Sequence, residues 1–158
     1  MNNEAAHASL WKTSDVIFGG ALLVGLVLDY ILPLSMENVV AANIRIIIGS
    51  VITSIGIFVA ALAKVQFSRA QQPSAPGRPT TGLVQNGIFK YTRNPLYLGL
   101  VMVLVGLGLT FHMPWWIILA GPVIGLVQWA LIMPEEKYLM EKFGHEYFLY
   151  TACVRRWI

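Results

Sequence analysis

The side chains of this sequence that could carry out chemistry fall in two short polar segments, each beside a long apolar stretch. The first segment runs from Tyr91 to Gly99 and contains Arg93, followed by Asn94 and Pro95. Pro95 fits the first turn of a helix, where its missing N–H costs nothing, and Asn94 can cap that helix. A guanidinium fixed beside this helix can bind a carboxylate or a phosphate through two parallel hydrogen bonds. An interfacial arginine bound to lipid phosphate is the alternative.

The second segment contains the adjacent acids Glu135 and Glu136, which follow Pro134. Acids in the first turn of a helix complement its dipole, so the pair would also suit an ordinary helix start. Two carboxylates are nevertheless unusual on a side of the protein that is otherwise basic. Their placement favours a cationic partner, and both interpretations are open at this point.

Several other kinds of site are excluded by what the sequence lacks. It has one cysteine, Cys153, and its histidines, His7, His112 and His145, are too scattered to suggest a metal site, so we expect none. There is no Walker motif, no GxSxG nucleophile motif and no HExxH zinc motif. The short sequence Gly106-Leu107-Gly108 lacks the strand–turn–helix setting of a dinucleotide-binding fold. We therefore interpret it as close helix packing.

The composition requires that membrane helices position these segments. Of 158 residues, 56% are hydrophobic and only 12% are charged, and the mean hydropathy is +0.64. Soluble domains carry about twice that share of charged residues. Four apolar runs of 18 or 19 residues, residues 16–34, 46–63, 96–113 and 115–133, match the hydrocarbon core of a bilayer. We predict an all-α integral membrane protein in which residues 1–158 form a single membrane domain with about four transmembrane helices.

The distribution of lysine and arginine predicts how the helices are oriented. Ten of the eleven lie on one side of the predicted spans, whereas Arg45 lies on the other side, where its long stem can reach the surface. Short loops rich in lysine and arginine stay in the cytoplasm. Both termini and the loop of residues 64–95 are therefore expected to be cytoplasmic, and in a bacterium the membrane would be the cell inner membrane.

After the fourth span, the sequence predicts a cytoplasmic C-terminal helix over residues 134–158 that is amphipathic and lies at the membrane interface. Leu139, Phe143, Tyr147 and Tyr150 recur near helical spacing and form its apolar stripe. Gly144 interrupts this pattern and marks a potential break in the helix.

Small residues and one acid stand out within the predicted spans. Seven glycines are expected to let neighbouring helices approach closely: Gly25, Gly49, Gly56, Gly106, Gly108, Gly121 and Gly125. Asp29 is the only acid in a span. It is either a residue at the membrane edge near Pro33 or an intramembrane carboxylate with a function.

Together, and in this order, the two polar segments and the apolar hairpin between them resemble the isoprenylcysteine carboxyl methyltransferase family. The run from Phe143 to Tyr147 adds to the resemblance, which covers about residues 82–156 and is shared by the related membrane phospholipid N-methyltransferases. It implies an integral membrane enzyme with S-adenosylmethionine in a pocket that faces the cytoplasm. By position, the implied cofactor-binding residues are Arg93, Asn94, Pro95, Tyr97, Gly99, Glu135 and Glu136, and the implied catalytic residues are Arg93 and Glu136. Gly106 and Gly108 match a GxG of the phospholipid branch.

One departure from the family pattern limits the chemistry that the resemblance implies. The commoner motif is Arg-His-Pro, and Asn94 stands here in place of the histidine. Asparagine can form hydrogen bonds but cannot take up a proton, so a histidine base at this position is excluded. In the amino acid group of S-adenosylmethionine, the ammonium could bind Glu135 or Glu136 and the carboxylate could bind Arg93.

The methyl acceptor is expected to be a lipophilic molecule that enters from the bilayer. A carboxylate acceptor needs no general base, whereas an amine or a thiol must lose a proton. The lack of an evident base favours an isoprenylcysteine-type carboxylate, with a phospholipid amine or a small thiol as alternatives. Two other functions are open: an NADPH-dependent reductase similar to the longer membrane sterol reductases, and a non-catalytic membrane protein built on the same hairpin. The expected partners are this substrate and membrane lipids, with no nucleic acid.

Overall fold

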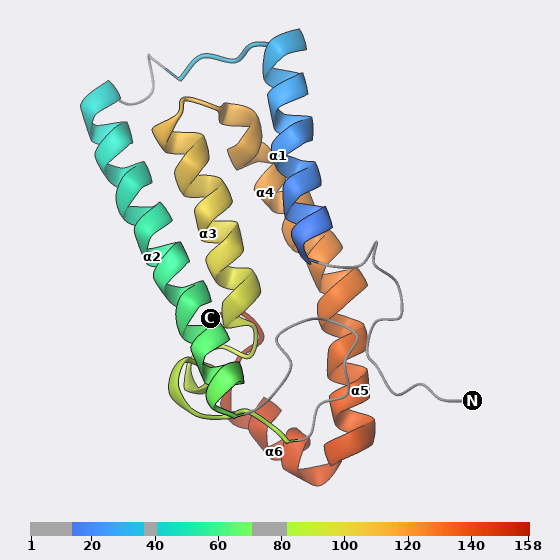
Figure 1. Cartoon of the computed structure of the whole chain (residues 1–158). Coiled ribbons are helices and arrows are strands. Elements are labelled where there is room, and N and C mark those ends of the chain that lie inside the picture. Colours follow the sequence, from blue (N-terminus) through green and yellow to red (C-terminus); the bar gives the residue numbers. More distant parts are fainter. Residues whose placement is uncertain (1–13, 37–40, 71–81) are drawn as a thin grey trace.

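The computed structural model describes residues 14–36, 41–70 and 82–158, and all regular elements in these ranges are helices (Figure 1). The longer helices are α1 (Ser14–Ile31), α2 (Ala42–Arg69), α3 (Pro95–Thr110), α4 (Pro114–Val127), α5 (Met133–Phe143) and α6 (His145–Cys153). The shorter elements are a 3-10 helix, η2 (Gly87–Lys90), and a π-helical turn, η3 (Gln128–Ile132). The predicted all-α class is confirmed.

The apolar helices form an antiparallel bundle in which α2 packs on α3, α3 on α4, and α4 on α1 (Figure 1). Three helices are long and apolar enough to cross a membrane, namely α1, α2 and the continuous helix Pro114–Phe143. The fourth, α3, is a shorter apolar helix of 16 residues. The prediction of about four membrane helices agrees with this arrangement. Asp29 lies in the last turn of α1, which fits its interpretation as an edge residue.

Two of the predicted spans are longer than the helices that form them. α1 ends at Ile31 although its predicted span continues to residue 34, and α3 ends at Thr110 although its predicted span continues to residue 113. Pro33 disfavours a helical conformation at the residue before it, which explains the end of α1. After α3, the positive φ of His112, 59°, turns the chain into α4. Local backbone preferences therefore end both helices before the apolar residues run out.

α2 extends well beyond the predicted span of residues 46–63. Its 28 residues form a helix about 42 Å long, compared with about 30 Å for the hydrocarbon core of a bilayer. Residues 64–69, which the sequence predicts as the start of the loop, are therefore helical, and the loop begins only after Arg69. Residues 71–81 of that predicted loop lie outside the described ranges.

The additional turns of α2 support the segment that leads into α3. The ring of Phe67 meets the ring of Phe89 edge-on, with centroids 5.1 Å apart. Gln66 packs closely on Gly87, whose positive φ of 62° and tight surroundings both suit glycine. These contacts fix η2, and with it the chain just before Arg93.

The fourth span and the acidic segment belong to one continuous helix, so the interpretation of Pro134 as a helix start is wrong. α4, η3 and α5 follow one another without a break. In η3, the Met133 N–H donates to the Gln128 carbonyl, five residues earlier, and this wider turn comes directly before Pro134. In a regular α-helix, a proline ring clashes with the carbonyl four residues earlier, so the wider turn accommodates the proline. The two acids therefore lie on a helix that is anchored in the membrane.

Gly144 divides the predicted C-terminal helix of residues 134–158 into two. Its φ of 49° ends α5, and after α6 the chain returns to the start of α3 as a C-terminal segment, residues 154–158. The predicted apolar stripe packs within the protein. Tyr147, Tyr150 and Val154 are buried in one cluster, and Leu139 and Phe143 are partly buried against it. The stripe therefore serves as a small core that holds the C-terminal segment.

The close approach of α2 and α3 depends on glycine, as predicted for Gly49, Gly56 and Gly106. A Cβ atom on Gly56 would lie 2.7 Å from the Gly99 carbonyl oxygen, and one on Gly49 would lie 2.7 Å from the Gly106 carbonyl oxygen. Such distances are too short for any real side chain, so the two backbones pack directly on each other, as in other small-residue membrane interfaces.

The same prediction holds for two of the other glycines and is wrong for two. A Cβ atom on Gly25 or Gly108 would collide with a side chain of α4. At Gly121 and Gly125 it would meet no described atom within 4 Å. This face of α4 is therefore not packed against another described helix.

The end of the bundle opposite α6 is closed by Arg45. Arg45 is only 9% exposed, and its Nη1 donates to the Leu109 carbonyl oxygen at 2.9 Å. The expectation that its stem reaches the surface is therefore wrong. Carbonyl groups in the last turn of a helix lack intrahelical partners and attract a cation, which explains the position of this guanidinium at the end of α3.

Candidate active site

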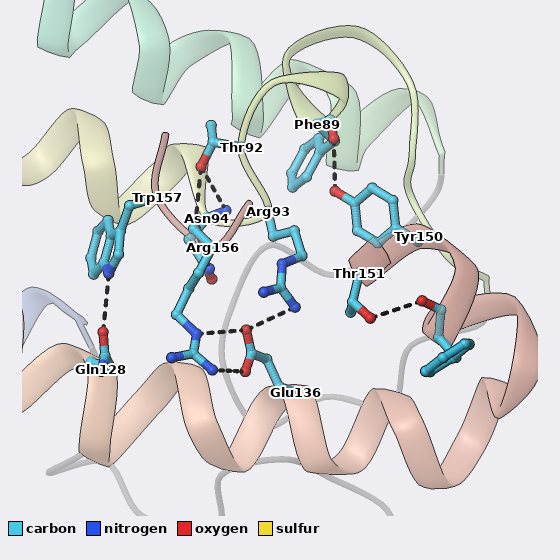
Figure 2. Close-up of polar contacts among 11 residues, drawn as sticks. Phe89, Thr92, Arg93, Asn94, Gln128, Glu136, Tyr150, Thr151, Arg156 and Trp157 are labelled. Atoms are coloured by element: carbon cyan, nitrogen blue, oxygen red, sulfur yellow. Dashed lines mark hydrogen bonds and ion pairs between the residues drawn. The ribbon is translucent and has the colours of Figure 1, made fainter. Parts of the chain in front are cut away.

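Four parts of the chain meet where α3 begins: the residues just before α3, helix α5, helix α6 and the C-terminal segment (Figure 2). The central contact joins the two segments that the sequence singles out. Arg93 Nη1 lies 3.2 Å from Glu136 Oε1, and the two side chains are only 14% and 17% exposed. The antiparallel order of the helices places the start of α3 beside the end of the helix that carries Glu136. The two predicted catalytic residues therefore lie together.

A second arginine, Arg156, binds the same carboxylate. Its Nε donates to Glu136 Oε1 at 3.0 Å, and its Nη2 donates to Oε2 at 2.7 Å, which makes a bidentate pair (Figure 2). The hydrogen bond to Glu136 raises the pKa of Arg156 above its already high value, so its positive charge is permanent. The arginine cluster, defined as Arg93, Glu136 and Arg156, thus has two positive charges and one negative charge.

Backbone hydrogen bonds hold the C-terminal segment against the start of α3. The Arg93 N–H donates to the Arg155 carbonyl oxygen at 3.0 Å. The Arg156 carbonyl oxygen accepts from Asn94 Nδ2 at 2.9 Å and from Thr92 Oγ1 at 3.3 Å. The expected side-chain cap of α3 by Asn94 is absent, because this amide binds the C-terminal segment instead.

Trp157 attaches the same segment to the membrane helices. Its indole Nε1 donates to Gln128 Oε1 at 3.1 Å, and its ring packs against the main apolar core of the bundle. Gln128 is the first residue of η3, and π-helical turns are frequent at functional sites. The C-terminal segment is therefore fixed at both the cluster and the bundle.

Two tyrosines of α6 support the cluster from the other side. The Tyr147 hydroxyl is hydrogen-bonded with the guanidinium of Arg93. Burial, with the charge of Glu136, raises the pKa of Tyr147 to about 12, although the Arg93 charge opposes this shift. Tyr150 donates to the Phe89 carbonyl oxygen at 2.7 Å, and burial raises its pKa as well. Both hydroxyls stay protonated at neutral pH, so neither is a general base.

Glu135 has different partners from its neighbour Glu136. Its carboxyl group is hydrogen-bonded with the hydroxyl of Tyr97, in the first turn of α3. Glu135 is half-buried, and no ion pair joins it to a cation within the described ranges. One acid therefore holds two arginines, whereas the other is held by a tyrosine and has no cation bound.

Pro95 and Gly99, which the resemblance places at the cofactor, have evident structural roles. Pro95 is the first residue of α3 and is fully buried. A Cβ atom on Gly99 would lie 2.5 Å from the Gly56 carbonyl oxygen and 2.8 Å from the Ala60 N atom of α2. Helix packing therefore accounts for this glycine, and its role at a cofactor stays a prediction. Packing against α2 and α4 likewise accounts for the two glycines of the GxG sequence.

We expect Gly99→Ala to lower the free energy of unfolding by about 1–3 kcal/mol, because the added methyl group meets backbone atoms of α2. Gly121→Ala is the matched control, since its Cβ would meet no described atom within 4 Å and alanine favours a helix more than glycine does. Thermal unfolding of the purified variants in detergent measures the difference. A Gly99→Ala protein with normal stability and lost S-adenosylhomocysteine binding would instead place Gly99 at the cofactor.

Arg156 and Tyr147 are site residues that sequence reasoning misses. In the sequence, Arg156 is one of several basic residues, and Tyr147 is one member of an apolar stripe. The sequence holds two weak signals. A tyrosine hydroxyl in an apolar stripe needs a hydrogen-bond partner when it is buried. Two arginines and a tryptophan, residues 155–157, follow that stripe. Neither signal identifies Glu136 as the partner.

The arrangement has the charges needed to bind a molecule that carries both an anion and a cation. The arginine cluster has an excess of positive charge, and Arg93 Nε is buried without a hydrogen-bond partner in the part of the chain that the structure describes. Beside the cluster, Glu135 provides a carboxylate. A free amino acid group, with its carboxylate and ammonium, fits this set of donors and acceptors. The described ranges contain no group of three or more His, Cys, Asp or Glu side chains placed to hold a metal ion.

Comparison with known proteins identifies a family. The phospholipid methyltransferase family matches residues 40–146, which include α2 to α5 and both polar segments. The match leaves out α1 and the residues that contribute Tyr147 and Arg156. No curated protein and no solved structure matches the chain. Because the family match covers more than half of its length, the chain belongs to the phospholipid methyltransferase family and is a membrane methyltransferase.

Proposed function

We propose that this protein uses S-adenosylmethionine to methylate a lipophilic acceptor that carries a carboxylate, such as an isoprenylcysteine. The observation that carries the proposal is the arginine cluster beside Glu135. The amino acid group of S-adenosylmethionine has a carboxylate and an ammonium, and the arginines and Glu135 complement these two charges. The Nε of Arg93 is buried and has no hydrogen-bond partner among the described residues, so the donors of this guanidinium are not all satisfied within the protein.

The proposed chemistry asks the protein mainly for binding and orientation. When bound, S-adenosylmethionine supplies a methyl group that is already activated by a sulfonium. The side chains of the site must hold the reactants in line and keep water out. Tyr97 holds Glu135, and Tyr147 holds Arg93, so the charged groups are positioned before a ligand arrives. The soluble cofactor enters from the cytoplasm, and the lipophilic acceptor enters from the bilayer.

The choice of a carboxylate acceptor rests on the proton chemistry of the side chains around the cluster. Arg156 keeps its positive charge, Tyr147 holds its proton at neutral pH, and Asn94 cannot take one up. A carboxylate acceptor needs no proton removed before it attacks a methyl group, whereas an ammonium or a thiol does. These side chains offer no general base, and they therefore favour an acceptor that is already a nucleophile.

A phospholipid amine is the second candidate acceptor, and the family match favours it. The matching family is described as phospholipid methyltransferase. In this case the half-buried Glu135 is the candidate general base among the described side chains of the site, since a carboxylate can accept a proton from an ammonium. The same cofactor site would serve either acceptor.

Methyl transfer from radiolabelled S-adenosylmethionine to a panel of acceptors tests the proposal. The panel contains an N-acetylated farnesylcysteine, phosphatidylethanolamine and a lipophilic thiol. We expect the label in the farnesylcysteine, released as methanol by alkali because the product is an ester. Alkali-stable label in phosphatidylethanolamine would contradict the proposed acceptor and leave the methyl donor in place. Failure of the wild-type protein to bind S-adenosylhomocysteine by calorimetry would contradict the donor.

The site is further proposed to face the cytoplasm, which in a bacterium lies inside the cell inner membrane. The basic residues near the site end of the described chain are Lys64, Arg69, Lys90, Arg93, Lys137, Lys142, Arg155 and Arg156, whereas Arg45 lies at the opposite end. This asymmetry is typical of a cytoplasmic side.

In intact cells, we expect a membrane-impermeant maleimide to leave Cys153 unlabelled, because this exposed cysteine ends α6 at the site end of the bundle. Permeabilised cells should show labelling. A Phe111→Cys variant in a Cys153→Ser background is the control, since residue 111 is 63% exposed at the opposite end and should react in intact cells. Labelling of Cys153 in intact cells would reverse the proposed topology.

A further inference from the structure

We infer that Arg156, in the C-terminal segment, acts with Arg93 as a two-arginine receptor for the carboxylate of the methyl donor. Glu136 is then the residue that aligns the two guanidiniums, and Glu135 receives the ammonium. This inference rests on the proposed use of S-adenosylmethionine. It goes beyond the family match, which ends before the residues of this segment.

The charge balance of the cluster favours an anion as its missing partner. Two guanidiniums share one carboxylate, and all three side chains are at least partly removed from water. An unbalanced positive charge in such a place is costly unless a counter-charge approaches it. No second anion forms an ion pair with these guanidiniums among the described residues, since Glu135 beside them pairs with no cation, so the cluster can accept a ligand carboxylate.

The hydrogen-bond donors of the two arginines are not all used on Glu136. Each guanidinium has five N–H donors. Arg156 uses Nε and Nη2 on Glu136, and Arg93 uses Nη1 on the same carboxylate. Arg93 Nε is buried and has no partner among the described residues. Glu136 thus fixes the orientation of both guanidinium groups without using all of their N–H donors.

The backbone of the C-terminal segment makes Arg156 a fixed group and not a mobile side chain at the protein surface. Its carbonyl is bound by Asn94 at 2.9 Å, and the residue before it is bound by the Arg93 N–H at 3.0 Å. Trp157, the next residue, is anchored on Gln128. A receptor group held in this way loses little conformational freedom when a ligand binds.

The two acids are distinguished by the same contacts. Glu136 is neutralised by two arginines, so a ligand ammonium would have to displace one of them. Glu135 has no such competitor within the described ranges, and the Tyr97 hydroxyl holds its carboxyl group. If Arg156 instead kept the ligand ammonium away from Glu136, its removal would strengthen ligand binding and not weaken it.

The test is calorimetric binding of S-adenosylhomocysteine to detergent-purified wild-type protein and to Arg156→Gln. We expect Arg156→Gln to bind about 10- to 150-fold more weakly, as for the loss of one charge-assisted hydrogen bond. Arg69→Gln is the control, because this exposed arginine in the last turn of α2 forms no ion pair with a described residue, and its affinity should match the wild type. A second ligand, decarboxylated S-adenosylmethionine, has the ammonium but no carboxylate. Arg156→Gln should bind it as well as the wild type does.

Three results would overturn the inference. Tighter binding of S-adenosylhomocysteine to Arg156→Gln would show that Arg156 competes with the ligand. Unchanged binding would show that it is only a structural anchor. An equal loss for both ligands would show a general disruption of the site. If Arg156→Gln does not fold, Arg156→Lys keeps the charge without the fork, and a selective loss of S-adenosylhomocysteine affinity is again expected. Wild-type protein that binds neither ligand would refute the proposed function itself, which separates the two failures.

Discussion

Arg93→Lys is expected to lose most of its methyl transfer, by about 100-fold or more, while inserting into the membrane normally. The guanidinium of Arg93 contacts Glu136 with one nitrogen, is hydrogen-bonded with Tyr147, and keeps a buried Nε. A lysine ammonium is a single point charge and cannot reproduce this planar fork. Loss of one charge-assisted hydrogen bond costs about 1.5–3 kcal/mol, and more than one is lost here. Transfer from labelled S-adenosylmethionine, at matched expression, measures the effect.

Arg69→Lys is the matched control for this variant. Arg69 is exposed in the last turn of α2, at the same end of the protein, and the same substitution there should leave activity nearly unchanged. If Arg93 served only as an anchor for lipid phosphate, lysine would replace it equally well. Near-normal transfer by Arg93→Lys would therefore remove Arg93 from the site.

Glu136→Gln and Glu135→Gln are expected to differ, although the two residues are adjacent. Glu136→Gln leaves two partly buried guanidiniums facing each other without an anion, so both cofactor affinity and stability should fall, the latter by about 1–3 kcal/mol. Glu135→Gln keeps an oxygen for the Tyr97 hydroxyl, and its stability should change by less than about 0.5 kcal/mol. Its affinity for S-adenosylhomocysteine should still fall about 10- to 150-fold, because the ammonium loses its counter-charge.

Thermal unfolding and calorimetry on the same detergent preparations measure the two quantities for both variants. The expected pattern is a loss of binding in both and a loss of stability in Glu136→Gln alone. Equal stability of the two variants would show that the arginine cluster contributes nothing to the fold. Normal binding by Glu135→Gln would exclude this carboxylate as the site of the ammonium.

The membrane helices could be predicted from the sequence, but several of their ends could not. The length of an apolar run indicates which part of a helix crosses the hydrocarbon core. It does not indicate how many further turns the helix makes in water. α2 therefore runs on to Arg69 beyond its predicted end at residue 63. The continuous helix through Pro134 depends on a π-helical turn, which releases the clash that a proline normally causes. That turn leaves no clear signal in residue types.

The pairing of Arg93 with Glu136 was within reach of sequence reasoning, whereas Arg156 was not. The two predicted residues lie at the ends of neighbouring antiparallel helices, so the order of the elements brings them to the same end. Arg156 arrives through the turn at Gly144 and through backbone hydrogen bonds, which any residue type can form. The orientation of Gly99 toward α2 depends likewise on which face of α3 is packed, and an almost uniformly apolar helix does not reveal that face.

The return of the C-terminal segment to Glu136 sets an order for the biogenesis of the protein. A ribosome makes about 5–20 residues per second from the N-terminus, so the bundle helices are synthesised before Arg156. Arg93 and Glu136, which form an ion pair in the structure, are therefore both made before Arg156, their third partner. A nascent chain can therefore be inserted in the membrane while its cluster is still incomplete. Arg156 reaches the arginine cluster only after α5, the turn at Gly144 and α6 have been made, so this part of the cluster forms after the helices that it joins.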